Sequence, residues 1–186
     1  MEPRSDTQPV SPADVLAFWR EAGPDKWFTK DPAFDAEIRE KFLGTYEAAV
    51  AGGLSEWEAT AEGALALVIV LDQFSRNMFR GDARTYAADP AARAVANRSL
   101  KRGYDQDVPP GERGFFFLPF MHSEDLADQD RCVALYREAG DPDLKYALEH
   151  HDVVRRFGRF PHRNVILGRA TTPEEQAFLD GGGFKG

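Results

Sequence analysis

Apolar residues recur at helical spacing along most of this chain. The clearest series has a four-residue period and stops before Gly52; it comprises Phe34, Ile38, Phe42, Tyr46 and Val50. Similar series run over residues 90–103, 123–140 and 142–161, whereas no stretch alternates between apolar and polar positions as an amphipathic strand does. The pattern predicts an all-α fold of seven or eight helices joined by short loops.

A recurring dipeptide marks where these helices are expected to begin. It consists of Ser, Thr or Asp followed by Pro, and it occurs at Ser11–Pro12, Asp31–Pro32, Asp89–Pro90, Asp141–Pro142 and Thr172–Pro173. The first residue can cap a helix through its side-chain oxygen, and proline suits the first helical position because no N–H is needed there. The stretch TPEE, with Glu175 three residues after Thr172, also has the spacing of a capping box.

The segment LALVIVLDQFSRNMFRG, residues 65–81, is apolar at its start and polar at its end. On a helix, one stripe is apolar and comprises Leu67, Val70, Leu71, Phe74 and Met78. A second stripe is polar and comprises Gln73, Arg76, Asn77 and Arg80, with Asp72 one turn before Arg76. We expect a central helix whose polar stripe faces either solvent or a polar pocket, because a buried guanidinium needs partners.

Two later segments supply candidate partners. FFFLPFMHSED, residues 115–125, ends in His122, Ser123 and Glu124, of which Ser123 can alternatively cap the next helix. HHDVVRRFGRFPHRNVILGR, residues 150–169, has five arginines against one aspartate, a formal charge of +4 in a chain whose net charge is -8. Such a basic island predicts either an anion site or a structural arginine network, and the two are compatible.

Composition narrows the class of protein. The chain has 186 residues, which fits a single domain over residues 1–186, and we expect its ends, residues 1–10 and the Gly-rich 181–186, to be flexible. The acidic charge argues against binding to nucleic acid or to an anionic membrane surface. The longest apolar run, residues 64–71, is far shorter than the roughly 20 residues of a membrane helix. The lone Cys132 and the absence of a signal-peptide pattern predict a cytoplasmic location.

Several kinds of chemistry lack their motifs. There is no nucleophile elbow and no phosphate-binding or dinucleotide-binding loop, so no cofactor is expected. The residues that could bind a metal are His122, Glu124, His150, His151, Asp152 and His162, but none of them forms a zinc motif, and no metal is expected. Acid–base chemistry by His122 or His162, with Glu124 as the orienting carboxylate, fits the residue types.

The motifs LDQFSRNMFRG, FLPFMHSED and FGRFPHRNVILGR, followed by TTPEEQAFL, together resemble the bacterial family called domain of unknown function 924. The resemblance spans nearly the whole chain, from VLAFWREAG to the last predicted helix. It implies an all-helical fold similar to tetratricopeptide-like α–α superhelices, and it implies no reaction. The motif positions are Asp72, Gln73, Arg76, Asn77, Arg80, His122, Ser123, Glu124, Gly158, Arg159, Pro161, His162, Arg163, Asn164 and Gly168.

These observations lead to three hypotheses. In the first, the three motifs converge in one cleft that binds a small anionic metabolite, as a binding protein or an enzyme. The ligand-binding residues would be Asp72, Gln73, Arg76, Asn77, Arg80, Ser123, Arg159, Arg163 and Asn164, and the catalytic residues would be His122, Glu124 and His162. In the second, a superhelical groove binds the terminal carboxylate of a peptide. In the third, the polar residues only lock helices together.

Overall fold

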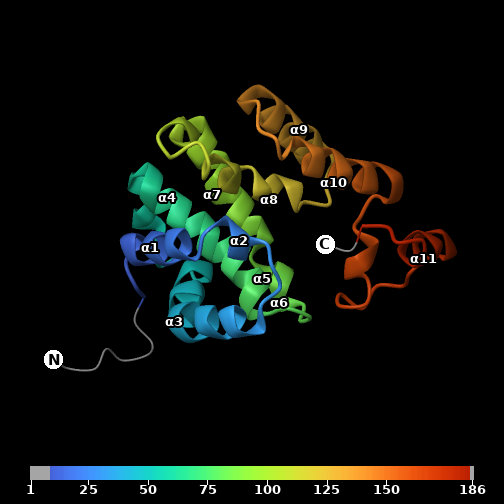
Figure 1. Ribbon diagram of the computed structural model, residues 1–186, viewed down its shortest axis with the longest axis horizontal. Coiled ribbons are helices and arrows are strands. Elements are labelled where there is room, and N and C mark those ends of the chain that lie inside the picture. Colours follow the sequence, from blue (N-terminus) through green and yellow to red (C-terminus); the bar gives the residue numbers. More distant parts are fainter. Residues whose placement is uncertain (1–8, 185–186) are drawn as a thin grey trace. The chain divides into compact units, whose positions relative to one another are not determined.

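The computed structural model describes residues 9–184, and all regular secondary structure in that range is helical (Figure 1). The predicted all-α fold is therefore confirmed. Seven of the described helices have eight or more residues, which agrees with the predicted seven or eight; the remaining elements are short turns of helix. In the described part of the chain, no helix is long and apolar enough to cross a membrane.

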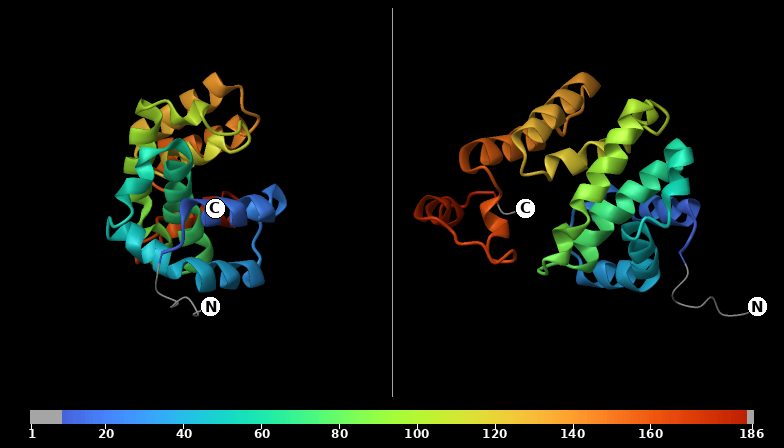
Figure 2. Two further views of the ribbon diagram at one scale, coloured as in Figure 1. Left: turned by 90° about the vertical axis from the view of Figure 1, so that its left-hand side faces the viewer. Right: turned by 180° about the vertical axis from the view of Figure 1, so that it is seen from behind.

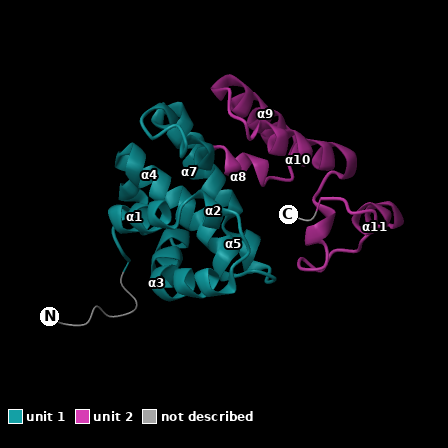
Figure 3. Ribbon diagram, in the orientation of Figure 1, with its two compact units in different colours: residues 1–116 teal, residues 117–186 magenta. Residues whose placement is uncertain are grey.

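The chain divides into two compact units, residues 1–116 and residues 117–186, which are described separately (Figure 3). The expectation of a single domain and of a tetratricopeptide-like superhelix stays a prediction. The elements of the first unit are α1 (Pro12–Ala22), α2 (Pro24–Trp27), α3 (Pro32–Val50), η1 (Ser55–Ala59), α4 (Ala61–Val68), η2 (Ile69–Phe74), α5 (Ser75–Met78), α6 (Arg84–Ala87), α7 (Asp89–Lys101), η3 (Tyr104–Gln106) and η4 (Arg113–Phe116). Those of the second are α8 (Leu118–Met121), α9 (Leu126–Ala139), α10 (Leu144–Phe157), η5 (Pro161–Arg163) and α11 (Pro173–Asp180).

Three of the five predicted helix starts are confirmed. Ser11, Asp31 and Thr172 each accept a hydrogen bond from a backbone N–H of the first turn, and proline follows at the first helical position. Ser11 and Thr172 both form complete capping boxes, with Asp14 and Glu175 respectively. These starts depend on residues a few positions apart, which explains why they could be predicted.

The other two predicted starts are wrong. Ala88 rather than Asp89 is the N-cap of α7, because the Asp89 carboxylate is held by Arg76 instead. Helix α10 begins at Leu144, since Asp141 accepts a hydrogen bond from the Asp143 N–H and forms a turn before the helix. Ser123 is not a cap either: the N-cap of α9 is Asp125, whose side chain accepts from the N–H of Ala127.

The central helix of unit 1 is the predicted one, but it is not a regular α-helix. Elements α4, η2 and α5 follow one another without a break, and η2 is a π-helix. Phe74, which is fully buried in η2, contacts the rings of Phe18, Trp19 and Phe42 at centroid distances of 6.2, 5.5 and 4.7 Å. Helices α1 and α3 thus bury their aromatic side chains against this element.

Unit 2 is built on α9 and α10, the orange helices of Figure 2, which pack against each other. Cys132 is fully buried in α9, as expected for a core cysteine, and burial raises the pKa of its thiol to about 12. A second apolar cluster lies at the end of α10, where Val153, Val154 and Phe160 pack with the partly buried Phe157, Phe178 and Phe184.

Most of the residues expected to form flexible ends, 1–8 and 185–186, lie outside the described residues. Within the described part, Val10 donates its N–H to the Thr45 hydroxyl, and residues 181–183 form a turn after α11.

Candidate functional site

The first predicted site segment places an aspartate inside unit 1. Asp72 is 1% exposed and lies in the π-helix η2. Gln73 donates to its carboxylate at 2.5 Å, while Ser75 and Arg76 donate to its backbone carbonyl at 3.0 and 2.9 Å. The wide turn of a π-helix leaves carbonyls without α-helical partners, so these side-chain donors stabilise the irregular backbone.

Arg76 is the hub of this polar cluster. It forms a bidentate ion pair with Asp89 at 2.9 and 3.1 Å, and its Nη1 lies 3.4 Å from the Asp72 carboxylate. Burial disfavours the charged guanidinium, but the two carboxylates outweigh that effect and raise the pKa of Arg76 above its usual value. Arg76 is therefore permanently charged and tied to two buried acids, one of them on α7.

Arg80 and Asn77 share a different carboxylate. Arg80 donates to both oxygens of Asp35 at 2.8 and 3.0 Å, and Asn77 donates to the same side chain at 2.7 Å. Hydrogen bonding to Asp35 raises the pKa of Arg80, whose side chain is 38% exposed. Because Asp35 lies in the first turn of α3, these bonds join α5 to α3.

Glu124, the predicted orienting carboxylate, has defined partners within unit 2. It forms a bidentate ion pair with Arg169 at 2.7 and 2.9 Å and accepts the Phe160 N–H at 2.8 Å. Partial burial would raise its pKa, but the bonds from Arg169 and Phe160 outweigh this and lower it. Glu124 thus acts as an ionised acceptor that holds the segment after α10 in place; its predicted catalytic role stays a prediction.

Glu175 is a second carboxylate that collects the polar residues of this segment. Arg159 donates to both of its oxygens at 2.6 and 2.9 Å, Asn164 donates at 3.1 Å, and the Thr172 N–H donates at 2.9 Å. The bonds from Arg159 are the main cause that lowers the pKa of Glu175 to about 2. The capping-box glutamate of α11 is therefore also the ion-pair partner of Arg159.

Three further predicted site residues, His122, His162 and Arg163, belong to a cluster of rings in unit 2, which we call the imidazole cluster. It consists of His122, His150, His162, Phe160, Arg163 and Phe184. The ring centroids of His122 and His150 are 6.3 Å apart, and those of His150 and Phe160 are 5.7 Å apart. Arg163 stacks 4.5 Å from the centroid of Phe160 and donates to the His122 carbonyl at 3.0 Å.

His150 is strongly perturbed electrostatically. Its pKa falls to about 3, mainly because burial disfavours the charged ring, and further because His122, Arg163 and His162 repel a positive charge there. Nδ1 lies 2.7 Å from the Tyr146 carbonyl, which only accepts, so Nδ1 must carry the proton. The neutral His150 therefore presents Nε2 as a hydrogen-bond acceptor and proton acceptor.

The predicted site residues thus fall into two groups. The first motif lies in unit 1, where its polar side chains find their hydrogen-bond partners. The second and third motifs meet within unit 2, where the Phe160 N–H donates to Glu124 and Arg163 donates to the His122 carbonyl. Ser123 donates to Asp128 at 2.7 Å and accepts the N–H of Asp125, which turns the chain into α9. The single cleft expected for all three motifs stays a prediction.

Sequence reasoning missed four partners. Asp35, Asp89, Arg169 and Glu175 hold the predicted residues, but Asp89 and Glu175 had been interpreted only as helix-start residues. An excess of arginine in motifs of an acidic chain signals that such carboxylates exist, without saying which they are. The sequence offers His150 only as a possible metal ligand, and the described residues contain no group of three His, Cys, Asp or Glu side chains that could hold a metal ion.

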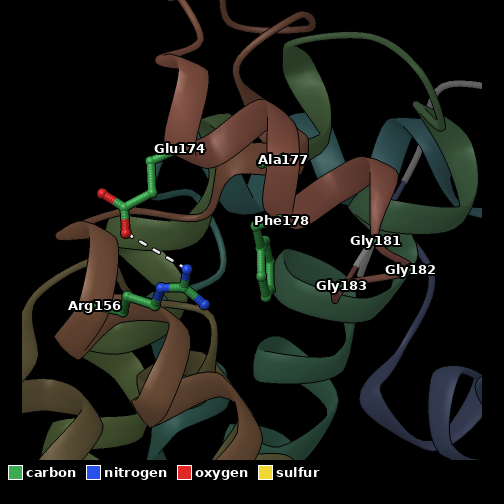
Figure 4. Close-up of a pocket in the computed structure, with 7 residues that line it drawn as sticks. All are labelled: Arg156, Glu174, Ala177, Phe178, Gly181, Gly182 and Gly183. Atoms are coloured by element: carbon green, nitrogen blue, oxygen red, sulfur yellow. Dashed lines mark hydrogen bonds and ion pairs between the residues drawn. The ribbon is translucent and has the colours of Figure 1, made fainter.

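Unit 2 also has an open groove of about 420 Å³ beside the turn after α11 (Figure 4). Arg156 and Glu174 form one wall with an ion pair at 3.4 Å, and Phe178 projects between them and the glycines of residues 181–183. Arg156 also lies 5.5 Å from the centroid of Phe178. None of the predicted site residues lines this groove.

Comparisons with known proteins agree on a family. The family model described as "Bacterial protein of unknown function (DUF924)" matches residues 15–183. A solved structure of a protein of unknown function from Agrobacterium tumefaciens is similar with a TM-score of 0.89 and 50% sequence identity, covering 91% of this chain and 97% of that one. No curated protein matches the chain significantly.

Proposed function

We propose an anion-binding function for this chain, which belongs to the DUF924 family of bacterial proteins of unknown function. The ligand site is the imidazole cluster of unit 2. The observation that carries this proposal is that three cationic or protonatable groups lie around the partly buried ring of His150: the His122 ring is 6.3 Å from it, and His162 and Arg163 contact the neighbouring ring of Phe160 at 5.8 and 4.5 Å. Their combined repulsion of positive charge is a potential that a small carboxylate or phosphate would relieve.

The other arginines that the sequence predicts as ligand-binding residues are held in ion pairs, which favours the imidazole cluster as the anion site. Arg76, Arg80 and Arg159 each make two hydrogen bonds to one carboxylate, and an incoming anion would have to displace that carboxylate. Displacement would leave an acid such as Asp89, which is 5% exposed, buried beside a new negative charge. We therefore assign these three arginines to the structural network. We assign Arg163 to the ligand because it lies in the imidazole cluster, where it stacks on Phe160.

Anion binding at this site is coupled to a proton. A negative charge beside His150 favours its charged form and raises its pKa from about 3 towards neutrality. His150 would then take up a proton at Nε2 when the ligand arrives. His150 could also accept a proton from a bound substrate. If the protein is an enzyme, His150 would therefore act as its general base.

Isothermal titration calorimetry with acetate and inorganic phosphate tests this proposal. The wild-type protein is expected to bind at least one of them, with an enthalpy that depends on the ionisation enthalpy of the buffer because a proton is taken up. At about 100 times its dissociation constant the ligand stabilises the fold by roughly 2.7 kcal/mol, which a thermal melt detects independently.

Two variants make the test specific. His150→Phe keeps a ring in the cluster but removes the proton acceptor, and it should abolish the buffer dependence. Arg80→Ala removes an arginine from unit 1 and should leave binding unchanged. Binding that is lost in Arg80→Ala, or that persists without buffer dependence in both variants, contradicts the assignment. If no anion binds the wild type, the cluster is a packing element only.

A further inference from the structure

We propose that the ring of Phe184 occupies the place of a ligand ring, so that the imidazole cluster takes aromatic anions and the C-terminal turn competes with them. This inference rests on the proposed anion site and names its ligand class. In this structure, Phe184 of the chain itself occupies the position that the ring of the ligand would take.

Phe184 is the residue that closes the cluster. Its ring lies edge-on to His150 at 4.3 Å and to His162 at 5.3 Å, and its centroid is 6.0 Å from that of Phe160. It also packs on the apolar cluster that contains Val153. These neighbours surround an aromatic ring with other rings, which is the geometry that aromatic groups favour.

The chain delivers Phe184 through a turn that only glycine can form. Gly182 has a φ of 81°, in the left-handed region, and the N–H of Gly183 donates to the Phe178 carbonyl at 2.9 Å. A Cβ on Gly183 would lie 2.6 Å from the Phe178 ring, so the chain passes directly over that ring (Figure 4). Phe184 is thus positioned by a short glycine turn at the edge of the open groove, and the proposed release of its ring would use the backbone freedom of these glycines.

The chemistry around the ring specifies what else fits there. The ring position of Phe184 is lined by the rings of Phe160, His150 and His162. Arg163 places its guanidinium over Phe160, and His150 contributes an acceptor. A ligand that consists of an aromatic ring and a carboxylate matches both features: the ring replaces Phe184 and the carboxylate is attracted to the cationic side. A small anion without a ring uses only the second feature.

A competing internal ring lowers the apparent affinity for a ligand that needs its place. If Phe184 occupies the recess about 90% of the time, removing it raises the affinity for an aromatic acid about tenfold, because only the open fraction binds. The affinity for acetate, which leaves the ring position alone, should change less than about twofold. The difference between the two probes is therefore the quantity of interest.

The experiment titrates benzoate and acetate into the full-length protein and its Phe184→Ala variant. Phe28→Ala, which removes a phenylalanine that is 65% exposed in unit 1, is the matched control and should behave as wild type. The expected result is a tenfold gain for benzoate in Phe184→Ala alone. Equal changes for both probes, or no change, overturn the inference while acetate binding still supports the anion site. If neither probe binds any variant, the aromatic-anion inference fails; if inorganic phosphate does not bind either, the anion site fails with it.

A spectroscopic readout is independent of affinity. With its ring centroid 4.3 Å away, Phe184 must shift the NMR signals of the His150 ring by its ring current. Phe184→Ala should move these signals, and benzoate should move them back towards their wild-type positions whereas acetate should not. Signals of His150 that are the same in both proteins would show that Phe184 does not occupy the cluster in solution.

Discussion

Arg76 is the residue of the first motif whose loss should damage unit 1 most. It is the shared counter-ion of Asp72 and Asp89, which are 1% and 5% exposed. The substitution Arg76→Ala removes the positive charge and leaves two buried carboxylates, one in the π-helix and one at the start of α7. Arg80→Ala is its natural control, since that arginine belongs to the same motif but is itself 38% exposed and pairs with the single, partly buried carboxylate of Asp35.

The two changes differ in magnitude because of burial. Removing one partner of a buried ion pair costs about 3–5 kcal/mol, whereas exposed pairs contribute about 0.2–1 kcal/mol. For a chain of this size, 1 kcal/mol corresponds to a change in melting temperature of about 2–4 °C. Arg76→Ala should therefore lower the melting temperature by about 6–20 °C, and Arg80→Ala by less than about 4 °C.

Thermal melts at neutral pH followed by circular dichroism are sufficient for this comparison. A third protein, Arg76→Ala combined with Asp89→Asn, should recover part of the loss because one of the two stranded charges is gone. If Arg76→Ala is no more harmful than Arg80→Ala, or if adding Asp89→Asn makes it worse by the full single effect, then the two residues do not form a buried pair and the reasoning is refuted.

Three further predictions concern pH and packing. The folded-state pKa of His150, about 3, lies below the usual 6.5, so the unfolded chain binds the extra proton and stability falls as pH drops below 6.5, by up to about 1.4 kcal/mol per pH unit. Thermal melts at pH 6.5 and 5 should show a smaller fall for His150→Phe, and equal falls would exclude a neutral His150 in the folded protein. Glu175, with a pKa of about 2 against the usual 4.5, contributes stability that is lost as pH falls from 4.5 towards 2. Glu175→Gln should have a lower melting temperature at neutral pH and should lose less stability on acidification to pH 3; an acid response like that of the wild type would contradict the pairing of Glu175 with Arg159. Gly63→Ala places a methyl group 2.1 Å from a backbone oxygen, whereas Gly111→Ala meets nothing within 4 Å. Denaturant titration should show that the free energy of unfolding falls by about 1–3 kcal/mol for the first change alone, and equal midpoints would mean that the backbone at Gly63 adjusts freely.

Much of the fold was predictable because its determinants are local. The period of apolar residues in α3 and the capping boxes at Ser11 and Thr172 involve residues three or four positions apart. Helix starts failed where a distant residue competed for the capping side chain, as Arg76 does for Asp89. The π-helical turn at Asp72 was not predictable from periodicity, since the i and i+4 pattern is the same before and after it.

The candidate site was less predictable because its partners are distant in sequence. Arg80 and Asp35 are 45 positions apart, and so are Arg169 and Glu124. A sequence shows that an arginine needs a partner, but 31 acidic residues in this chain could supply one. Which carboxylate is used depends on how the helices pack, and no pattern of spacing encodes that.

The contrast between the two units follows from the chemistry of their cations. A guanidinium is charged at every physiological pH, so a buried arginine needs a permanent carboxylate, and Arg76 has two in unit 1. An imidazole can leave water without a counter-ion because it gives up its proton, as the partly buried His150 does. The arginine network is therefore fixed once the chain has folded, whereas the imidazole cluster can still gain a charge. A ligand that brings negative charge can be coupled to proton uptake only where the charge state can respond, and for this reason we propose the proton-coupled anion site in unit 2.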